Sequence, residues 1–129
     1  MERQAMMEVA MRAIARQDTH EVDGILDCFA EDVTFMMPVL ARPLRGRDEL
    51  RANVMHAWPE STTEVEWTSV DGNRLTLCWR WQGKGEDFAD APPLRGVSTF
   101  VFDDDGLVSE YEDWFDPDWM TRHGPAGRE

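Results

Sequence analysis

The stretch GVSTFVFDDDGLVSEYEDWFDP (residues 96–117) contains two runs rich in β-branched and aromatic residues, separated by the sequence DDDG. Such runs are typical of β-strands, and aspartates followed by a glycine are typical of a tight turn. The stretch therefore predicts strands over residues 94–102 and 107–115, joined by a turn at residues 103–106. An antiparallel strand pair of this kind indicates a sheet that forms the C-terminal half of the fold.

The second of these strands places an acidic residue among aromatic ones. Side chains alternate between the two faces of a strand, so Tyr111, Asp113 and Phe115 fall on one face. Removal from water between aromatic residues would raise the pKa of Asp113 and suit a general acid or base near neutral pH. In the alternative interpretation, Asp113 belongs to a solvated acidic edge together with Glu110 and Glu112. The residues alone leave both interpretations open.

The rest of the chain predicts helices first and strands afterwards. Apolar residues recur at helical spacing in the first part of the chain, and alternating runs bounded by turn residues follow. The order predicts a single α+β domain over residues 1–129, with helices on one face of a curved, mainly antiparallel sheet. Helices are predicted over residues 2–17, 18–29 and 47–58, and Asp18 can cap the second of them. Strands are predicted over 32–37, 62–70 and 73–82, with a hairpin turn at Asp71-Gly72, loops over 38–46 and 83–93, and a frayed polar tail over 121–129.

The composition restricts the partners and the compartment. The 129 residues include 26 acidic and 13 basic side chains, for a net charge of −13 at pH 7. This charge repels phosphate backbones, so nucleic-acid binding is not expected. No run approaches the roughly 18 apolar residues of a membrane-spanning helix, and the charged N-terminal residues do not resemble a signal peptide. We therefore expect a cytoplasmic protein without a membrane partner.

Cys28 and Cys78 are expected to be buried thiols, and the 3 scattered histidines predict no metal site.

Three segments, together with the order of helices and strands, resemble the nuclear transport factor 2-like superfamily, in particular its SnoaL-like and limonene epoxide hydrolase-like branch. The segments are FAEDVTF (residues 29–35), PLRGRDEL (residues 43–50) and the stretch 96–117. The resemblance implies a cone-shaped fold, in which a strongly curved sheet wraps around N-terminal helices and leaves an apolar cavity. It also implies a homodimer formed through the outer face of the sheet. The superfamily includes hydrolases, isomerases, cyclases, dehydratases and proteins that only bind ligands, so the fold by itself does not name a reaction.

Taken residue by residue, the resemblance implies a catalytic site made of Asp113, Arg80 and Gln82. Asp113 matches the last-strand aspartate that resembles the acid or base of SnoaL-like cyclases, and Arg80 matches the arginine that orients such a carboxylate. Gln82 stands where the epoxide hydrolases carry a second aspartate, and an amide cannot transfer a proton. Phe35 and Met36 stand near the positions that hold the reacting water in those hydrolases. The resemblance therefore implies one acid or base with an orienting arginine and a hydrogen-bonding amide.

The predicted strand over residues 73–82 has two incompatible interpretations. Alternation places Arg80 and Gln82 on one face and Trp79 and Trp81 on the other. The pattern by itself puts the tryptophans in the core and Arg80 in solvent. The resemblance implies the reverse, with Arg80 and Gln82 in the cavity, where a buried charge is paired, and with Trp79 and Trp81 forming the homodimer interface. We favour the second interpretation.

The functional hypothesis is a cofactor-independent enzyme that uses Asp113 as general acid or base on a small apolar molecule. A polyketide-like, terpenoid or epoxide substrate fits this hypothesis, and the reaction would be a cyclisation, an isomerisation or a hydrolysis. The alternative is a non-catalytic small-molecule-binding or accessory protein on the same scaffold, which the missing second carboxylate at Gln82 favours. A third hypothesis is an interaction domain with a tryptophan-rich sheet face. The expected walls of the pocket are hydrophobic residues: Phe35, Met37, Trp58, Trp67, Phe100, Tyr111 and Phe115.

Overall fold

The predicted α+β class is confirmed by the order of the elements. The computed structural model describes residues 1–53 and 59–123. Among these residues, the N-terminal half contains three helices, and most of the strands follow them. The elements are α1 (Arg3–Asp18), α2 (Val22–Leu26), β1 (Phe29–Met36), β2 (Leu44–Arg45), α3 (Gly46–Asn53), β3 (Ser61–Asp71), β4 (Arg74–Gly83), the 3₁₀ turn η2 (Glu86–Phe88), β5 (Leu94–Phe102), β6 (Val108–Phe115) and α4 (Pro117–His123).

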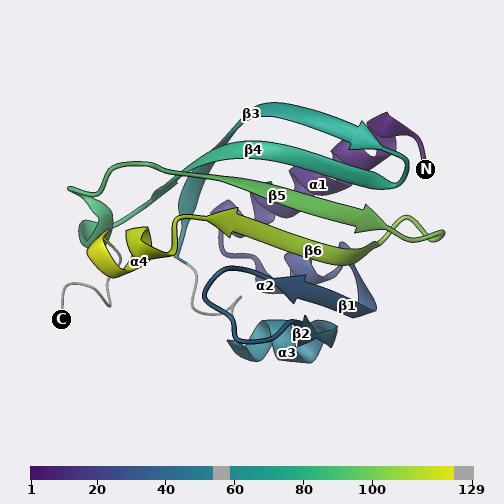
Figure 1. Cartoon of the computed structure of the whole chain (residues 1–129), viewed down its shortest axis with the longest axis horizontal. Helices are drawn as coiled ribbons and strands as arrows, with labels where there is room; N and C mark the ends of the chain where they lie inside the picture. The colour runs from purple at the N-terminus through teal and green to yellow at the C-terminus, as the bar shows by residue number, and fades with distance from the viewer. Residues whose placement is uncertain (54–58, 124–129) are drawn as a thin grey trace.

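The strands form one six-stranded sheet in the order β2-β1-β6-β5-β4-β3 (Figure 1). Each neighbouring pair is antiparallel except β1 and β6, which are parallel. The predicted turns join β3 to β4 and β5 to β6. Gly72 and Gly106 have φ angles of 62° and 80° in these turns, a region that glycine adopts without steric strain. The chain therefore returns tightly enough for β3 to β6 to pair in sequence order.

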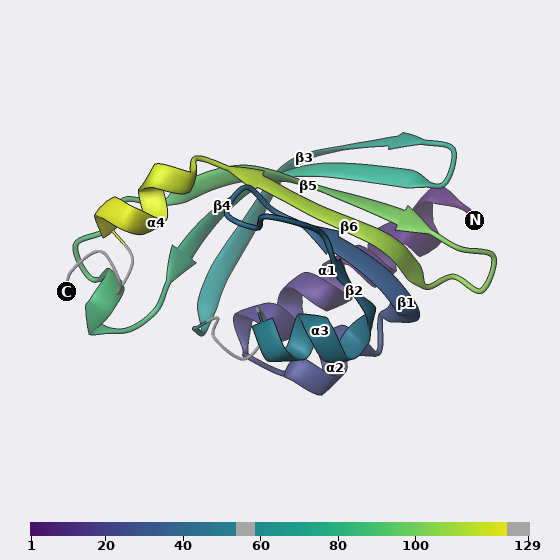
Figure 2. The ribbon, with the colours of Figure 1, turned by 60° about the horizontal axis from the view of Figure 1, so that its bottom comes forward.

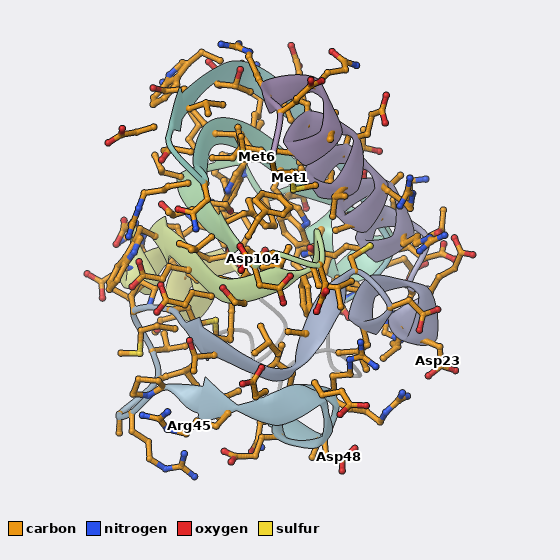
Figure 3. All side chains as sticks on the ribbon, turned by 90° about the vertical axis from the view of Figure 1, so that its right-hand side faces the viewer. Met1, Met6, Asp23, Arg45, Asp48 and Asp104 are labelled. Carbon is orange, nitrogen blue, oxygen red and sulfur yellow. The ribbon has the colours of Figure 1, made fainter. Side chains whose placement is uncertain are left out.

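The sheet curves over the N-terminal helices, and the core lies between them. Figure 2 shows α1, α2 and α3 on the same side of the curved sheet. Met6 and Ala10 of α1 are buried there, and so are the inward residues Leu75, Phe100 and Val108 of the sheet. In Figure 3, Met6 lies in the interior, whereas Asp23, Arg45 and Asp48 reach outward from the edge of the molecule. Removal of the apolar faces from water is the main force that holds the two layers together.

Strand β4 corrects the favoured interpretation of its two faces. Leu75, Leu77 and Trp79 are buried, and Arg80 is exposed on the opposite face beside Glu64 and Arg95 of the neighbouring strands. The apolar alternation decides the orientation, because burial of these large side chains outweighs anything gained by placing a guanidinium in the cavity. Arg80 therefore does not line the cavity, and Trp79 does not form an outer surface.

The helix boundaries differ from the predicted ones at two places. The predicted helix over residues 18–29 is confined to α2, because His20 takes a φ of 57° after α1 ends. Asp18 ends α1 instead of capping the next helix, and its carboxylate accepts hydrogen bonds from Ser61 and Thr63 of β3. Residues 121–123, predicted as part of a frayed tail, continue α4.

Within residues 1–53 and 59–123, none of the helices is long and apolar enough to cross a membrane.

Candidate active site

Asp113 is buried at the centre of the inner sheet face. Alternation along β6 places Tyr111, Asp113 and Phe115 on one face, as predicted. This face turns toward the helices, and Asp113 is only 4% exposed. The register of the hairpin places Asp113 directly opposite Ser98 of β5. A carboxyl group in this position is almost completely removed from water.

A chain of hydrogen bonds surrounds the Asp113 carboxyl group. The Ser98 hydroxyl donates to Oδ1 of Asp113 at 2.5 Å. The Tyr111 hydroxyl donates to Oδ2 at 3.0 Å. The indole Nε1–H of Trp79, on β4, donates to Oγ of Ser98 at 2.7 Å. Three neighbouring strands thus contribute to one buried network, and each oxygen of the carboxylate has a donor.

Burial changes the protonation of both acidic groups in this network. It raises the pKa of Asp113 to about 6, while the hydrogen bonds from Ser98 and Tyr111 act in the opposite direction. Burial and the nearby charge of Asp113 raise the pKa of Tyr111 well above its ordinary value. Tyr111 therefore keeps its proton, and Asp113 exchanges its proton near neutral pH, where a general acid or base is most effective.

The Asp113 carboxyl group opens into a cavity of about 440 Å³ between the sheet and the helices. This volume lies within the range of small-molecule sites, about 300–1,000 Å³. Ile14 and Gln17 of α1 line one side, and Lys84 and Asp87 are the charged residues from the segment after β4. The other described lining residues are mainly apolar or aromatic: Met37, Val39, Pro59, Thr63, Trp79, Trp81, Phe88, Leu94, Ser98, Tyr111 and Phe115.

Aromatic rings pack together at one end of the cavity. The Trp81 ring meets Phe88 edge-on at a centroid distance of 5.5 Å, and Trp119 of α4 stacks on Phe88 at 6.5 Å. Figure 1 shows α4 and the η2 turn at the same end of the sheet. Gly83 permits this packing, since a β-carbon there would lie 2.7 Å from the Phe88 ring. The segment after β4 lines the cavity through Phe88, and the C-terminal helix packs against that segment through Trp119.

Some of the residues predicted for the pocket lie along the cavity, and others lie beneath it. Met37, Tyr111 and Phe115 line the cavity. Phe35 and Phe100 are fully buried beneath it, where their rings contact Tyr111 at centroid distances of 4.9 and 4.7 Å. These two phenylalanines therefore fix the tyrosine ring and do not meet a ligand directly.

Three predicted site residues do not meet Asp113. Arg80 is on the outer face, as described above. Gln82 shares that face and reaches the segment after β4, where its Nε2 donates to the Phe88 carbonyl oxygen at 3.4 Å. Trp67 is 50% exposed and also on the outer face, because an irregularity between Val65 and Trp67 shifts the alternation of β3. Trp58 lies outside the described residues.

Sequence reasoning missed Ser98, Trp79 and Phe88 as site residues. Ser98 is the polar residue among the inward, mostly apolar positions of β5, and this contrast was an available signal. The pairing of Ser98 with Asp113 could not be predicted from the sequence, since the register changes by one residue between Val101 and Phe102. Trp79 was assigned to the wrong face, and Phe88 lies in a segment without periodicity. Within the described part of the chain, no three His, Cys, Asp or Glu side chains gather in a way that could hold a metal ion.

The comparisons with known proteins agree with this architecture. The sequence model of the SnoaL-like domain matches residues 10–111. No match was found among curated proteins. An NTF2-like protein of unknown function from Burkholderia pseudomallei is 20% identical, with a TM-score of 0.80 over 94% of this chain and 98% of that chain.

Two enzyme-related structures share the fold at similar identity. SalBIII, an epoxide hydrolase/cyclase-like enzyme of pyran ring formation in the polyether salinomycin, is 19% identical, with a TM-score of 0.74 over 91% of this chain and 95% of that chain. A putative ketosteroid isomerase from Kribbella flavida is also 19% identical, with a TM-score of 0.71 over 88% of this chain and 78% of that chain. At this identity the likeness shows the fold alone, whereas the match to residues 10–111 covers most of the sequence. The chain belongs to the SnoaL-like domain family and has the NTF2-like fold.

Proposed function

We propose that the protein is a cofactor-independent enzyme of the isomerase or cyclase type, in which Asp113 moves a proton on a small, largely apolar substrate. The observation that carries this proposal is the buried Asp113 carboxyl group at the base of an apolar cavity. Its pKa of about 6 allows it to take a proton and to return one at neutral pH.

A single carboxyl group is sufficient for an isomerisation or an intramolecular cyclisation. The carboxylate takes a proton from a carbon or hydroxyl of the substrate, and the electron pair stays on the substrate. The resulting carboxylic acid then returns the proton to another atom of the same molecule. Hydrolysis has a further requirement, since a water molecule must be held and activated, and Gln82 supplies no second acid or base at this site. Isomerase or cyclase chemistry therefore fits the residues better than hydrolysis.

The cavity favours a neutral substrate with a compact apolar body. Its walls are aromatic and aliphatic, and the charged lining residues Lys84 and Asp87 come from the segment after β4. Asp113, Tyr111 and Ser98 are the polar groups at its base. A molecule with one carbonyl, hydroxyl or epoxide oxygen directed at these groups would satisfy them and bury the rest of its surface against the rings.

The test follows proton transfer directly, without a known product. Enolisable cyclic ketones and epoxy alcohols are incubated with the protein in D₂O, and NMR follows deuterium incorporation and ring closure. We expect exchange or cyclisation that Asp113→Asn lowers by about 10²–10⁴-fold, the usual contribution of a general acid or base. Asp116→Asn, which alters an exposed carboxylate outside the cavity lining, is the matched control. Full activity in the Asp113→Asn variant would rule out the proposed role.

A ligand-binding protein without catalysis is the second candidate. The observation that favours it is the single buried carboxyl group, because many acid–base mechanisms pair two ionisable groups. It predicts that members of the same panel bind, as measured by calorimetry, while the wild-type protein produces no exchange and no new product. Retained affinity in Asp113→Asn would agree with this candidate, and turnover lost in that variant would exclude it.

A further inference from the structure

We infer that Trp79 and Ser98 form a positioning relay that keeps a hydrogen on the Oδ1 side of Asp113, so that the exchangeable proton of Asp113 resides on Oδ2 beside Tyr111. The catalytic meaning of the relay rests on the proposed function. The order of the hydrogen bonds in the relay does not depend on the proposed function, and this order can be tested without a substrate.

The direction of the relay follows from the chemistry of its first member. An indole Nε1–H is a donor and cannot accept. The contact of 2.7 Å between Trp79 Nε1 and Ser98 Oγ therefore obliges the serine oxygen to accept. A hydroxyl group carries one hydrogen, and the Ser98 hydroxyl directs it to Oδ1 of Asp113 at 2.5 Å. Trp79 thus restricts the orientation of the Ser98 hydroxyl and favours its donation to Oδ1.

The proton of the acid must then reside on the other oxygen. A hydrogen on Oδ1 would oppose the hydrogen that Ser98 already directs there. Oδ2 faces Tyr111 Oη at 3.0 Å, and a phenol both donates and accepts. In the ionised state Tyr111 donates to Oδ2. In the protonated state Oδ2 donates to Tyr111 or to the substrate, and the tyrosine hydrogen can turn toward the cavity that both side chains line.

The geometry of the relay depends on the absence of a side chain at Gly96. Trp79 of β4 pairs with Gly96 of β5, and the indole lies across that glycine toward Ser98. A β-carbon on Gly96 would lie 2.4 Å from Cζ2 of Trp79, the ring carbon next to the one that carries Nε1. Trp79 is only 8% exposed, so water does not compete strongly for its N–H.

After burial, the hydrogen bonds of this network are the next influences on the pKa of Asp113. From β6 and β5, the groups that face it are Tyr111 and Ser98. From α1, the nearest lining residues are the uncharged Ile14 and Gln17, and the charged lining residues are Lys84 and Asp87 after β4. A change of pH near 6 is therefore expected to act on Asp113 itself among the groups that line the cavity.

The first measurement is an NMR titration of the wild-type protein. The Trp79 indole N–H resonance, assigned with Trp79→Phe, is recorded from pH 4 to 8 together with the carboxyl ¹³C resonance of Asp113. We expect both to titrate with one shared midpoint, because ionisation of Asp113 strengthens the chain Asp113–Ser98–Trp79. We also expect the indole titration to disappear in Asp113→Asn. An indole resonance that does not follow the Asp113 midpoint would overturn the inference.

Variants of Ser98 and Trp79 then distinguish a role in positioning the Asp113 proton from a role in packing alone. Ser98→Ala removes the donor to Oδ1, so we expect a higher Asp113 midpoint and about 10- to 100-fold lower proton-transfer activity. Trp79→Phe keeps an aromatic ring but no N–H, and we expect a smaller change in the same direction. Ser98→Thr, which retains the hydroxyl, should restore the midpoint. Trp81→Phe is the matched control, since the Trp81 indole lines the same cavity outside the relay, and it should leave the midpoint unchanged.

The outcomes distinguish the relay from the proposed function. If Trp79→Phe has the wild-type midpoint and pH profile, Trp79 only fills space, and the relay is wrong. If the shared titration is present but the wild-type protein moves no proton on any substrate, the relay is right and the proposed function fails. Should Ser98→Ala not fold, the wild-type titration and Trp79→Phe still decide between these outcomes.

Discussion

Burial of the ionised Asp113 carboxylate in the core lowers the free energy of unfolding. The side chain is almost completely buried, and its hydrogen bonds come from two neutral hydroxyl groups. No described cation pairs with it, so desolvation is the largest influence on its pKa. A residue that served only to stabilise this layer would be apolar, like Phe100 and Leu77 beside it. The retained carboxyl group is what distinguishes this cavity from an ordinary core.

The pH dependence of folding provides a prediction for this residue. In the folded state the pKa of Asp113 is about 6, against an ordinary value of 3.8. The folded state therefore binds the proton more tightly. The corresponding stabilisation is fully present below pH 3.8, is lost as the pH rises through 6, and amounts to about 3 kcal/mol. We expect Asp113→Asn to unfold at higher urea concentration than the wild type at pH 8, with the difference shrinking toward pH 4.

This prediction is checked by urea unfolding of both proteins at several pH values. Asp116→Asn is the control, because Asp116 is exposed and its pKa is lowered, first by the hydrogen bond from the Asp118 backbone and then by that from Arg122. That variant should show no gain in stability at pH 8. A wild-type protein as stable as Asp113→Asn at pH 8 would contradict a buried, ionised carboxylate.

At the scale of elements, the site depends on the alignment of three strands. Trp79 on β4, Ser98 on β5 and Asp113 on β6 are far apart in the sequence. They meet because the pairing registers place Ser98 opposite Asp113 and Trp79 opposite Gly96, two residues before Ser98. Asp18 gives a second example, since its carboxylate ties the C-terminal end of α1 to Ser61 and Thr63 at the start of β3. The cavity wall formed by α1 is thereby held at a defined distance from the sheet.

The absence of a side chain at Gly96 matters both for the packing of the strands and for the geometry of the site. We expect Gly96→Ala to lower the free energy of unfolding by about 1–3 kcal/mol, because its methyl group would overlap the Trp79 ring and the Trp114 carbonyl oxygen. Displacement of the indole should also break the bond to Ser98 and remove the indole titration described above. Urea unfolding and the indole NMR signal measure the two effects.

The control for Gly96 is a double-mutant cycle with Trp79→Ala. Removal of the ring removes the largest overlap, so Gly96→Ala should be less destabilising in that background, although the Trp114 carbonyl oxygen remains close. An equal effect in both backgrounds would show that Gly96 does not make room for Trp79.

On the scale of the whole molecule, the outer sheet face is the surface that the helices leave uncovered. A row of cross-strand neighbours, Trp67–Cys78–Val97–Trp114, runs across β3, β4, β5 and β6. Trp67 and Trp114 at its ends are 50% and 44% exposed. Arg80 and Arg95 lie beside this row, and Arg95 pairs with Glu66. Large exposed apolar side chains in one row are typical of an interaction surface.

We expect a homodimer through this outer face, with Trp67 and Trp114 in the roles first assigned to Trp79 and Trp81. Trp114→Glu should weaken self-association by at least about tenfold, as loss of a buried tryptophan does at interfaces. Sedimentation velocity over a range of protein concentrations measures this effect. Met11→Glu, which changes an exposed apolar residue on α1, should leave association unchanged. A wild-type protein that sediments as a monomer at every concentration would refute the expectation.

The sequence by itself determined the features that depend on local patterns. The order of helices and strands, the turns at Asp71-Gly72 and at residues 103–106, and the shared face of Tyr111, Asp113 and Phe115 follow from alternation and turn chemistry within short segments. The match over residues 10–111 then assigns the family. These features are local because neighbouring residues of a strand must point to opposite faces, whatever packs above them.

Only the tertiary structure decided which residues meet Asp113. The orientation of β4, which excludes Arg80 and brings in Trp79, follows from the burial of the whole inner face. The partnership of Asp113 with Ser98 follows from a one-residue irregularity in the hairpin. The position of Trp67 follows from a similar irregularity in β3. The register of a strand pair and the face that a strand turns inward depend on packing against several strands and helices. These contributions cannot be read from a short segment of the sequence.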